Sequence, residues 1–393
     1  MTLPQGLTDP RIARGEAIAN KGGQIRRVDE YTYQVRSQSG LWYYDVLSTE
    51  AGWVCSCPDA KYHDSKCKHI IAVEFSFAIR KEVRQSIAIA PITGQACPSC
   101  GSDGTVRHGI RRNESGDIQR FSCKSCGKWF VVNLGFERMH ATPQMISSAM
   151  QLYFTGESLR NVQRFLRLQG VNISHVSIYK WIRKYVKLMG SYLDQMKPQV
   201  SDTWRTDELY LKVKGDMKYL FAMMDDETRF WIAQQVSSNK GTSDVRPMFK
   251  EAQSITGKKP KTLISDGAGN FLIATRKEWW TRYANDRTEH VRDIRLGGRV
   301  HNNKMERMNE EVRDREKVMR GLKTVDTPIL KGYQIFHNFI RPHEALDGKT
   351  PAEAAGIKVE GENKWMTLIQ NASRSHMAEP SCQGTPEEQT TTP

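Results

Sequence analysis

No stretch of this 393-residue sequence is long and apolar enough to cross a membrane, and its first residues lack the pattern of a secretory signal. Both absences predict an intracellular, cytoplasmic protein. Acidic residues are fewer than basic ones: the chain has 44 aspartates and glutamates and 58 lysines and arginines, which gives a net charge of +14. This excess favours a polyanionic partner, and nucleic acid is the first candidate. A chain of this length is also expected to form several domains.

Cysteine is rare outside two short segments. The first segment holds Cys55, Cys57, Cys67 and His69, directly before an apolar-periodic stretch, 70–83, that should be helical. In a reducing compartment, three thiolates and one imidazole at this spacing predict a structural zinc site rather than disulfides. The alternative is a chance cluster of reduced core cysteines. The spacing resembles the SWIM zinc finger, a module linked to DNA and protein binding.

The second segment contains two Cys-x-x-Cys pairs, Cys97 with Cys100 and Cys123 with Cys126, each followed by glycine. A glycine there allows the backbone to turn its amides toward the thiolates, so the four cysteines predict a second structural zinc ion. The segment resembles a zinc ribbon, which serves either as a DNA contact or as a purely structural support. Cys382, alone in a polar tail, has no predicted role.

Three helices are predicted between residues 141 and 197, with Ser or Thr at their starts and Gly between them. The last two form a short helical pair whose final helix presents His175, Lys180 and Arg183 on its outer face. This arrangement fits a helix-turn-helix that reads DNA. An ordinary amphipathic hairpin with a solvated face is the alternative.

A carboxylate, Asp207, lies in the middle of a strand-like run, 203–213. An acid there is costly to bury unpaired, and a metal ion would remove that cost. Asp266 ends a short apolar strand, and Glu306 lies on a polar helix predicted over 302–319, so both are candidates for the remaining ligands. Carboxylate oxygens suit Mg²⁺ or Mn²⁺, and a pair of such ions can cleave and join phosphodiester bonds.

Helical spacing places Asn302, Glu306, Asn309 and Arg313 on one face of that helix. Such a face suits a metal ion with a bound phosphate. Glu310 remains an alternative to Glu306 as the third carboxylate.

Three strands joined by tight turns, then a helix and a short strand, resemble the ribonuclease H-like fold. The predicted fold class is therefore a multidomain α+β and α/β protein, with a mixed catalytic sheet flanked by helices. The predicted domains are a SWIM-like module (1–90), a zinc ribbon (91–140), a helix-turn-helix (141–197), a catalytic domain (198–356) and a polar, disordered tail (357–393).

Several short motifs carry a family resemblance: 206–215 around Asp207, Asp266-Gly, 302–306 ending on Glu306, 320–323 and 338–343. Together they resemble the DDE-class transposases of bacterial and archaeal insertion sequences, most closely insertion-sequence family six, over approximately residues 140 to 356.

The resemblance implies that Asp207, Asp266 and Glu306 bind two divalent metal ions and that Arg313 contacts DNA. Asn302 and Asn303 become further candidate DNA contacts. It also implies a prokaryotic, nucleoid-associated protein that binds the double-stranded ends of its element and target DNA as a homodimer or larger assembly. The competing hypotheses are a catalytically inactive, sequence-specific DNA-binding regulator and a ribonuclease that acts on RNA–DNA hybrids.

Overall fold

The computed structural model describes residues 9–378 apart from short gaps at 22–23, 29–30, 41, 50–51, 64–65, 84–86, 93–95, 114–115, 132–133, 138, 140, 284–285, 293–301, 320–321 and 323–326. The chain divides into two units. The first unit comprises Met1–Ile87, Lys197–Asp326 and Arg341–Ile357; the second comprises Ala88–Met196, Thr327–Ile340 and Lys358–Pro393. Within the described residues, no helix is both long and apolar enough to cross a membrane.

The first unit begins with a four-stranded antiparallel sheet in the order β1-β2-β3-β4. Its elements are α1 (Pro10–Asn20), β1 (Ile25–Arg27), β2 (Thr32–Arg36), β3 (Tyr43–Thr49), β4 (Gly52–Cys55), α2 (Pro58–Tyr62) and α3 (Lys68–Val83). Alternating residues such as Tyr33, Val35 and Val46 turn into a core shared with α3. A Cβ at Gly15 of α1 would lie 2.5 Å from the Ile71 side chain, so glycine permits this close helix contact. The helix predicted over 70–83 is confirmed as part of α3, whereas α1 and β1 were not predicted.

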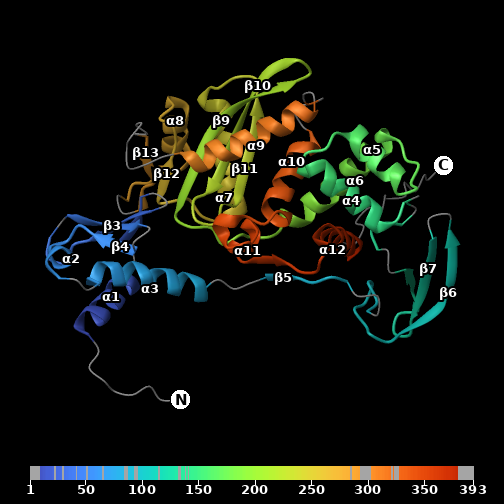
Figure 1. The fold of residues 1–393 in the computed structure, drawn as a ribbon, viewed down its shortest axis with the longest axis horizontal. Helices are drawn as coiled ribbons and strands as arrows, with labels where there is room; N and C mark the ends of the chain where they lie inside the picture. The colour runs from blue at the N-terminus through green and yellow to red at the C-terminus, as the bar shows by residue number, and fades with distance from the viewer. Residues whose placement is uncertain are drawn as a thin grey trace, which may run out of the picture. The chain divides into compact units, whose positions relative to one another are not determined.

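A five-stranded mixed sheet forms the rest of the first unit's core, in the order β11-β10-β9-β12-β13 (Figure 1). Its strands are β9 (Thr203–Val213), β10 (Asp216–Asp225), β11 (Trp231–Ser237), β12 (Thr262–Ile264) and β13 (Glu289–Val291). The first three are antiparallel, and β12 and β13 run parallel to β9. This is the strand order of the ribonuclease H-like fold, as the sequence predicted.

Helices cover both faces of this sheet. On one face lies α9 (Asn303–Met319), which packs across β9 (Figure 1). On the other face lie α7 (Thr242–Thr256) and α8 (Gly269–Glu278), where Phe271 meets Phe221 of β10 edge to face. Residues 208 and 221 are register partners, so odd-numbered β9 residues, including 207, point to the α9 side.

The second unit contains a three-stranded antiparallel sheet and a helical bundle. The sheet is formed by β6 (Thr105–Asn113), β7 (Gly116–Cys123) and β8 (Trp129–Val131), and the first helices are α4 (Pro143–Thr155), α5 (Leu159–Leu168) and α6 (His175–Leu193). The side chains of Thr142, Ser158 and Ser174 accept hydrogen bonds from the first turns of these helices, as predicted.

The predicted disordered tail is wrong over residues 357–378. This segment contains β14 (Ile357–Val359) and α12 (Lys364–Ala378), and α12 packs on α4 and α6. Trp365 is buried, stacks on Phe154 at 5.5 Å and donates a hydrogen bond to Gln151 at 2.8 Å. Residues 379–393, including Cys382, lie outside the described part of the chain.

The boundaries predicted for the catalytic domain, 198–356, also differ from those of the first unit. Residues Thr327–Ile340, which form α10 (Pro328–Ile335) and a π-helical turn (Phe336–Ile340), belong to the second unit and pack on α6. The remaining short elements are β5 (Ile87–Ile89), a 3-10 turn (Glu344–Leu346) and α11 (Pro351–Ala354).

Candidate catalytic centre and metal sites

The first set of predicted zinc ligands converges in the core of the four-stranded sheet. Cys55 ends β4, Cys57 caps α2, and Cys67 and His69 lie at the start of α3. Their ligand atoms all lie within 4.8 Å of one another, and all four residues are buried. The ring of Tyr44 lies 4.8 Å from the His69 ring and covers it. Burial raises the pKa of the Cys57 thiol, and a cation would reverse this by stabilising the thiolate.

The second set of predicted ligands also converges. The Sγ atoms of Cys97 and Cys126 are 3.6 Å apart, and those of Cys100 and Cys123 are 3.5 Å apart. A tetrahedron with Zn–S bonds of about 2.3 Å has S–S edges of about 3.8 Å, so four cysteines at these separations fit zinc. The glycines after the two pairs adopt φ angles of 74° and 70°, which is the turn that the sequence predicted.

The parallel pairing of β9 and β12 brings Asp266 beside Asp207. Ile264 is the register partner of Arg205, and two further residues along both strands lead to the two aspartates. Asp207 is half-buried, whereas Asp266 lies at the exposed end of its strand and accepts a 3.0 Å hydrogen bond from the Ala268 amide. The turn after Asp266 leaves its carboxylate at the sheet edge.

Helix α9 brings Glu306 to the same place. Asn309 Nδ2 donates a 2.8 Å hydrogen bond to Asp207 Oδ2, and Asn302 Nδ2 lies 3.5 Å from the Thr206 carbonyl oxygen. Glu306 lies between these two asparagines on the same helix face, so it is held over the middle of β9. The sequence predicted this shared face and its fit to a metal ion with a bound phosphate, but not the hydrogen bond from Asn309 to Asp207.

The electrostatics of Asp207 reflect this convergence. Burial is the largest cause that raises the pKa of its carboxyl group to about 7, and the charges of Asp266, Glu208 and Glu306 act in the same direction. The charge of Glu306 therefore reaches Asp207 from α9. Within the described residues, only the two cysteine sets hold all of their ligand atoms within 4.8 Å, so the three carboxylates are more widely spaced.

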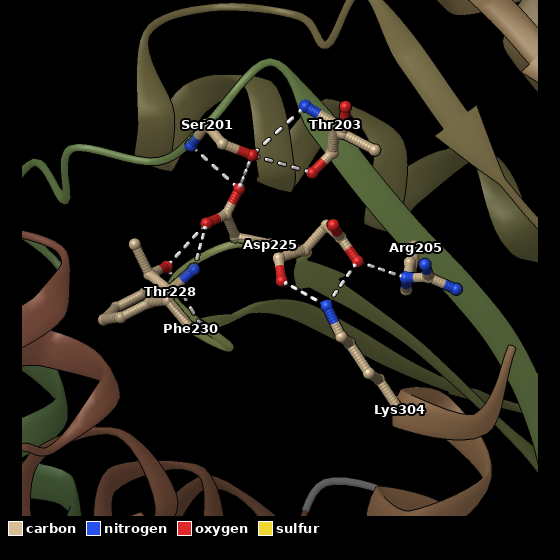
Figure 2. A network of polar contacts seen from close by, with 8 residues as sticks. Ser201, Thr203, Arg205, Asp225, Thr228, Phe230 and Lys304 are labelled. Carbon is tan, nitrogen blue, oxygen red and sulfur yellow. Dashed lines mark hydrogen bonds and ion pairs between the residues drawn. The ribbon is translucent and has the colours of Figure 1, made fainter. Parts of the chain in front are cut away.

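A buried charge cluster fixes the strand and the helix that carry these carboxylates (Figure 2). Asp226, directly after β10, accepts an ion-paired hydrogen bond from Arg205 Nε of β9. Lys304 Nζ of α9 lies 3.0 Å from both Asp226 Oδ1 and the Asp226 carbonyl oxygen. All three side chains are almost fully buried, so the cluster clamps α9 to the sheet two residues before Glu306.

The neighbouring Asp225 closes the turn after β10 in the same view (Figure 2). Its carboxylate accepts hydrogen bonds from the Ser201 amide at 2.8 Å and hydroxyl at 2.6 Å, and from the Thr228 amide at 2.8 Å and hydroxyl at 2.6 Å. The sequence analysis missed this network. Two adjacent acids directly after the apolar run 219–224 were the available signal.

The candidate DNA contacts divide into exposed and buried residues. Lys180 and Arg183 are exposed on α6, and His175 is half-buried at its start. On α9, Asn303 and Arg313 are exposed.

Asn302 is only 3% exposed. The predicted DNA contact of Asn302 is therefore corrected to a contact between the start of α9 and the backbone of β9.

Two family models match this chain. Residues 201–343 match a DDE domain, and residues 47–77 match the SWIM zinc finger. The first range contains all three carboxylates, and the second contains the first zinc-ligand set.

Related proteins and structures agree with these matches. The transposase for insertion sequence-like element IS431mec of Staphylococcus aureus is 27% identical over 123 residues, which are 30% of this chain and 53% of that protein. The transposase for insertion sequence element IS257 in transposon Tn4003 of the same species matches to the same extent. The chain thus spans about half the length of these relatives.

Among solved structures, the magnesium-bound catalytic core domain of HTLV-2 integrase is 18% identical, with a TM-score of 0.30 over 41% of this chain and 98% of that one. Because this TM-score is low, the assignment of a ribonuclease H-like fold rests on the strand order of the five-stranded sheet and not on this similarity. Residues 201–343 are therefore a DDE domain of the kind carried by insertion-sequence transposases, preceded at residues 47–77 by a SWIM zinc finger.

Proposed function

We propose that this chain is a DNA transposase that cleaves DNA at the ends of its element and joins the freed 3′ end to target DNA. The observation that carries the proposal is the half-buried Asp207, whose pKa is raised by burial and by the nearby charges of Asp266 and Glu306. Such repulsion is costly without a cation, and active sites are where this kind of arrangement is maintained.

Asp207, Asp266 and Glu306 are the residues that would hold Mg²⁺ or Mn²⁺, because they offer hard oxygen ligands without any cysteine. Bound there, such ions would supply activation of a water or 3′-hydroxyl and stabilisation of the departing oxygen. The protein's own part is to fix the ligands: Asn309 orients Asp207, and the Lys304–Asp226 contact holds Glu306 in place.

The two cysteine sets would each hold a structural zinc ion, and DNA would be bound by residues outside the catalytic centre. On α6 these are His175, Lys180 and Arg183, and on α9 they are Asn303 and Arg313. The partner is double-stranded DNA at the element ends and at the target, bound by a homodimer or larger assembly in the cytoplasm.

The test is cleavage of a DNA fragment that carries the element's own terminal sequences, with purified protein and Mg²⁺. The wild-type protein is expected to nick or join this DNA, and Asp207→Asn is expected to bind it without cleaving. Equal cleavage by the variant would refute the catalytic assignment. Sequence-specific binding without cleavage by the wild type would instead identify a DNA-binding regulator.

A further inference from the structure

Helix α6 places one apolar side chain in the middle of an exposed basic face. The side of α6 that packs into the bundle is formed by buried residues at helical spacing, namely Ile178, Ile182, Tyr185, Val186 and Met189. Opposite them, residues at steps of four, three and four form one line along the helix, which we call the outer stripe: Val176, Lys180, Arg183 and Lys187. Val176 is 50% exposed, and its three cationic neighbours in the stripe are exposed as well. The valine therefore contributes little to the core of the bundle.

The charge of two neighbouring helices restricts what can cover the outer stripe. Helices α5 and α6, which pack on each other (Figure 1), together contain seven lysines and arginines and no aspartate or glutamate. Arg160, Arg164 and Arg167 of α5 are exposed, like the cations of α6. A partner for such a surface must be strongly anionic, and the major groove of DNA is wide enough to hold one helix. Charge complementarity therefore favours double-stranded DNA as the occupant.

The position of Val176 along α6 predicts what it would contact in that groove. It is the second residue of the helix, and in a helix-turn-helix the first residues of the second helix contact base edges. Lys187 lies eleven residues further along, which is about 16 Å and suits a phosphate at the border of a groove about 12 Å wide. Base edges in the major groove present polar donors and acceptors, and the apolar exception is the C5-methyl group of thymine.

The start of α6 holds Val176 in place. Ser174 caps the helix, because its hydroxyl oxygen accepts a 3.1 Å hydrogen bond from the Ser177 amide. Gly170 adopts a φ angle of 79°, which turns the chain between α5 and α6. A β-branched valine in a helix has one strongly preferred rotamer, so it loses little side-chain entropy when it packs on a methyl group.

We propose that Val176 packs on the C5-methyl group of a thymine in the terminal sequence of the element, and that it thereby makes α6 specific for that base. Lys187 contacts a phosphate of the same duplex. The contact buries apolar surface of both partners, and no other base offers a methyl group at that position. This inference rests on the proposed transposase function for the identity of the DNA.

The test measures, by fluorescence anisotropy, binding of the full-length protein without Mg²⁺ to a duplex with the element's own terminal sequence. Deoxyuridine replaces thymidine at one position at a time, which removes the methyl group and keeps the base pair. At one position or more, the wild-type affinity is expected to fall about fourfold, the effect of losing one buried methyl group. Val176→Ala is expected to bind the thymine duplex this weakly and to lose the difference between the two duplexes.

Three further variants separate base contact from charge and from folding. Val176→Ile should keep the difference between thymine and deoxyuridine, because an apolar branched side chain remains. Val54→Ala is the matched control, since Val54 is 53% exposed on β4 of the SWIM module, and it should behave as the wild type. Lys187→Ala should weaken both duplexes equally and reduce the salt dependence by about one counterion. Alanine is a better helix former than valine, so Val176→Ala keeps α6 folded.

The proposal would be overturned if the wild type bound all the deoxyuridine duplexes as tightly as the thymine duplex, or if Val176→Ala kept a difference between them. It would also be overturned if Val176→Ala changed the mass of the free protein in ultracentrifugation and weakened all duplexes equally, which would indicate an interface between copies of this chain. Cleavage without methyl dependence would contradict this inference alone. Methyl-dependent binding without cleavage would contradict the transposase function alone.

Discussion

Asn309 Nδ2 and Asp207 Oδ2 are joined by a 2.8 Å hydrogen bond between a helix and a strand that are far apart in the sequence. This bond fixes the carboxylate that would face the metal ions. Asn309→Ala is expected to lower Mg²⁺ affinity or cleavage about 10–100-fold, the usual effect of losing a partner that orients a ligand. Isothermal titration with Mg²⁺ measures the affinity, and Asn239→Ala, in an exposed loop of the same unit, is the control.

The identity of the third carboxylate can be decided by two parallel substitutions. Glu306→Gln is expected to reduce Mg²⁺-dependent cleavage by more than about a hundredfold, because a ligand contributes more than the groups that orient it. Glu310→Gln, one turn further along α9, should stay within a few-fold of the wild type. The opposite ranking would move the third ligand to Glu310.

Asp207 predicts a specific pH dependence of stability. Its pKa is raised to about 7 in the folded chain, whereas an unfolded aspartate titrates near pH 4. Between these values the folded state binds more protons, so this residue's contribution to the free energy of unfolding decreases as pH rises from about 4 to about 7. Thermal unfolding without metal should show this decrease, and Asp207→Asn should remove part of it. Added Mg²⁺ should stabilise the wild type more at pH 8 than at pH 5.

The buried cluster around Asp226 should be important for stability. Asp226→Asn removes a buried negative charge that pairs with both Arg205 and Lys304 and is expected to cost about 3–5 kcal/mol. Urea unfolding followed by tryptophan fluorescence measures this loss, because Trp204 and Trp231 are buried in the same sheet. Asp216→Asn, an exposed acid at the other end of β10, should change the free energy of unfolding by less than about 0.5 kcal/mol.

Metal analysis tests the two cysteine sites independently. The wild-type chain is expected to contain two zinc ions, and Cys57→Ser and Cys123→Ser should each remove one of them by opening a four-ligand site. Cys382→Ser should keep both. A protein that retains two ions after either of the first substitutions would contradict the ligand assignment.

Local patterns were enough to predict the elements whose own residues determine them. The alternation of Leu209, Leu211 and Val213 defines β9 because each is buried on one face of the sheet. In contrast, β13 has only three residues and exists because it pairs with β12. No local pattern marks such a strand.

Apart from the predicted metal-ligand sets, contacts between distant residues were beyond sequence reasoning. Helical spacing gave the shared face of Asn302, Glu306 and Asn309, but it could not tell which strand that face would meet. The same holds for Arg205, Asp226 and Lys304, since each reads as an ordinary surface charge until the fold brings them together. Helix α12, in contrast, could have been predicted from its own residues. Trp365, Leu368 and Ile369 have helical spacing and are buried, but the polar tail that follows them led to a prediction of disorder for the whole segment.

Helix α6 of the second unit packs on α10 and α12, which follow it in the chain only after the five strands of the mixed sheet and α9. During translation, the helical bundle therefore lacks two of its helices until the ribosome has passed Ala378. A fragment that stops before α10 would leave the apolar side of α6 without the cover of α10 and α12. The bundle can thus be completed only after Asp207, Asp266 and Glu306 have been synthesised.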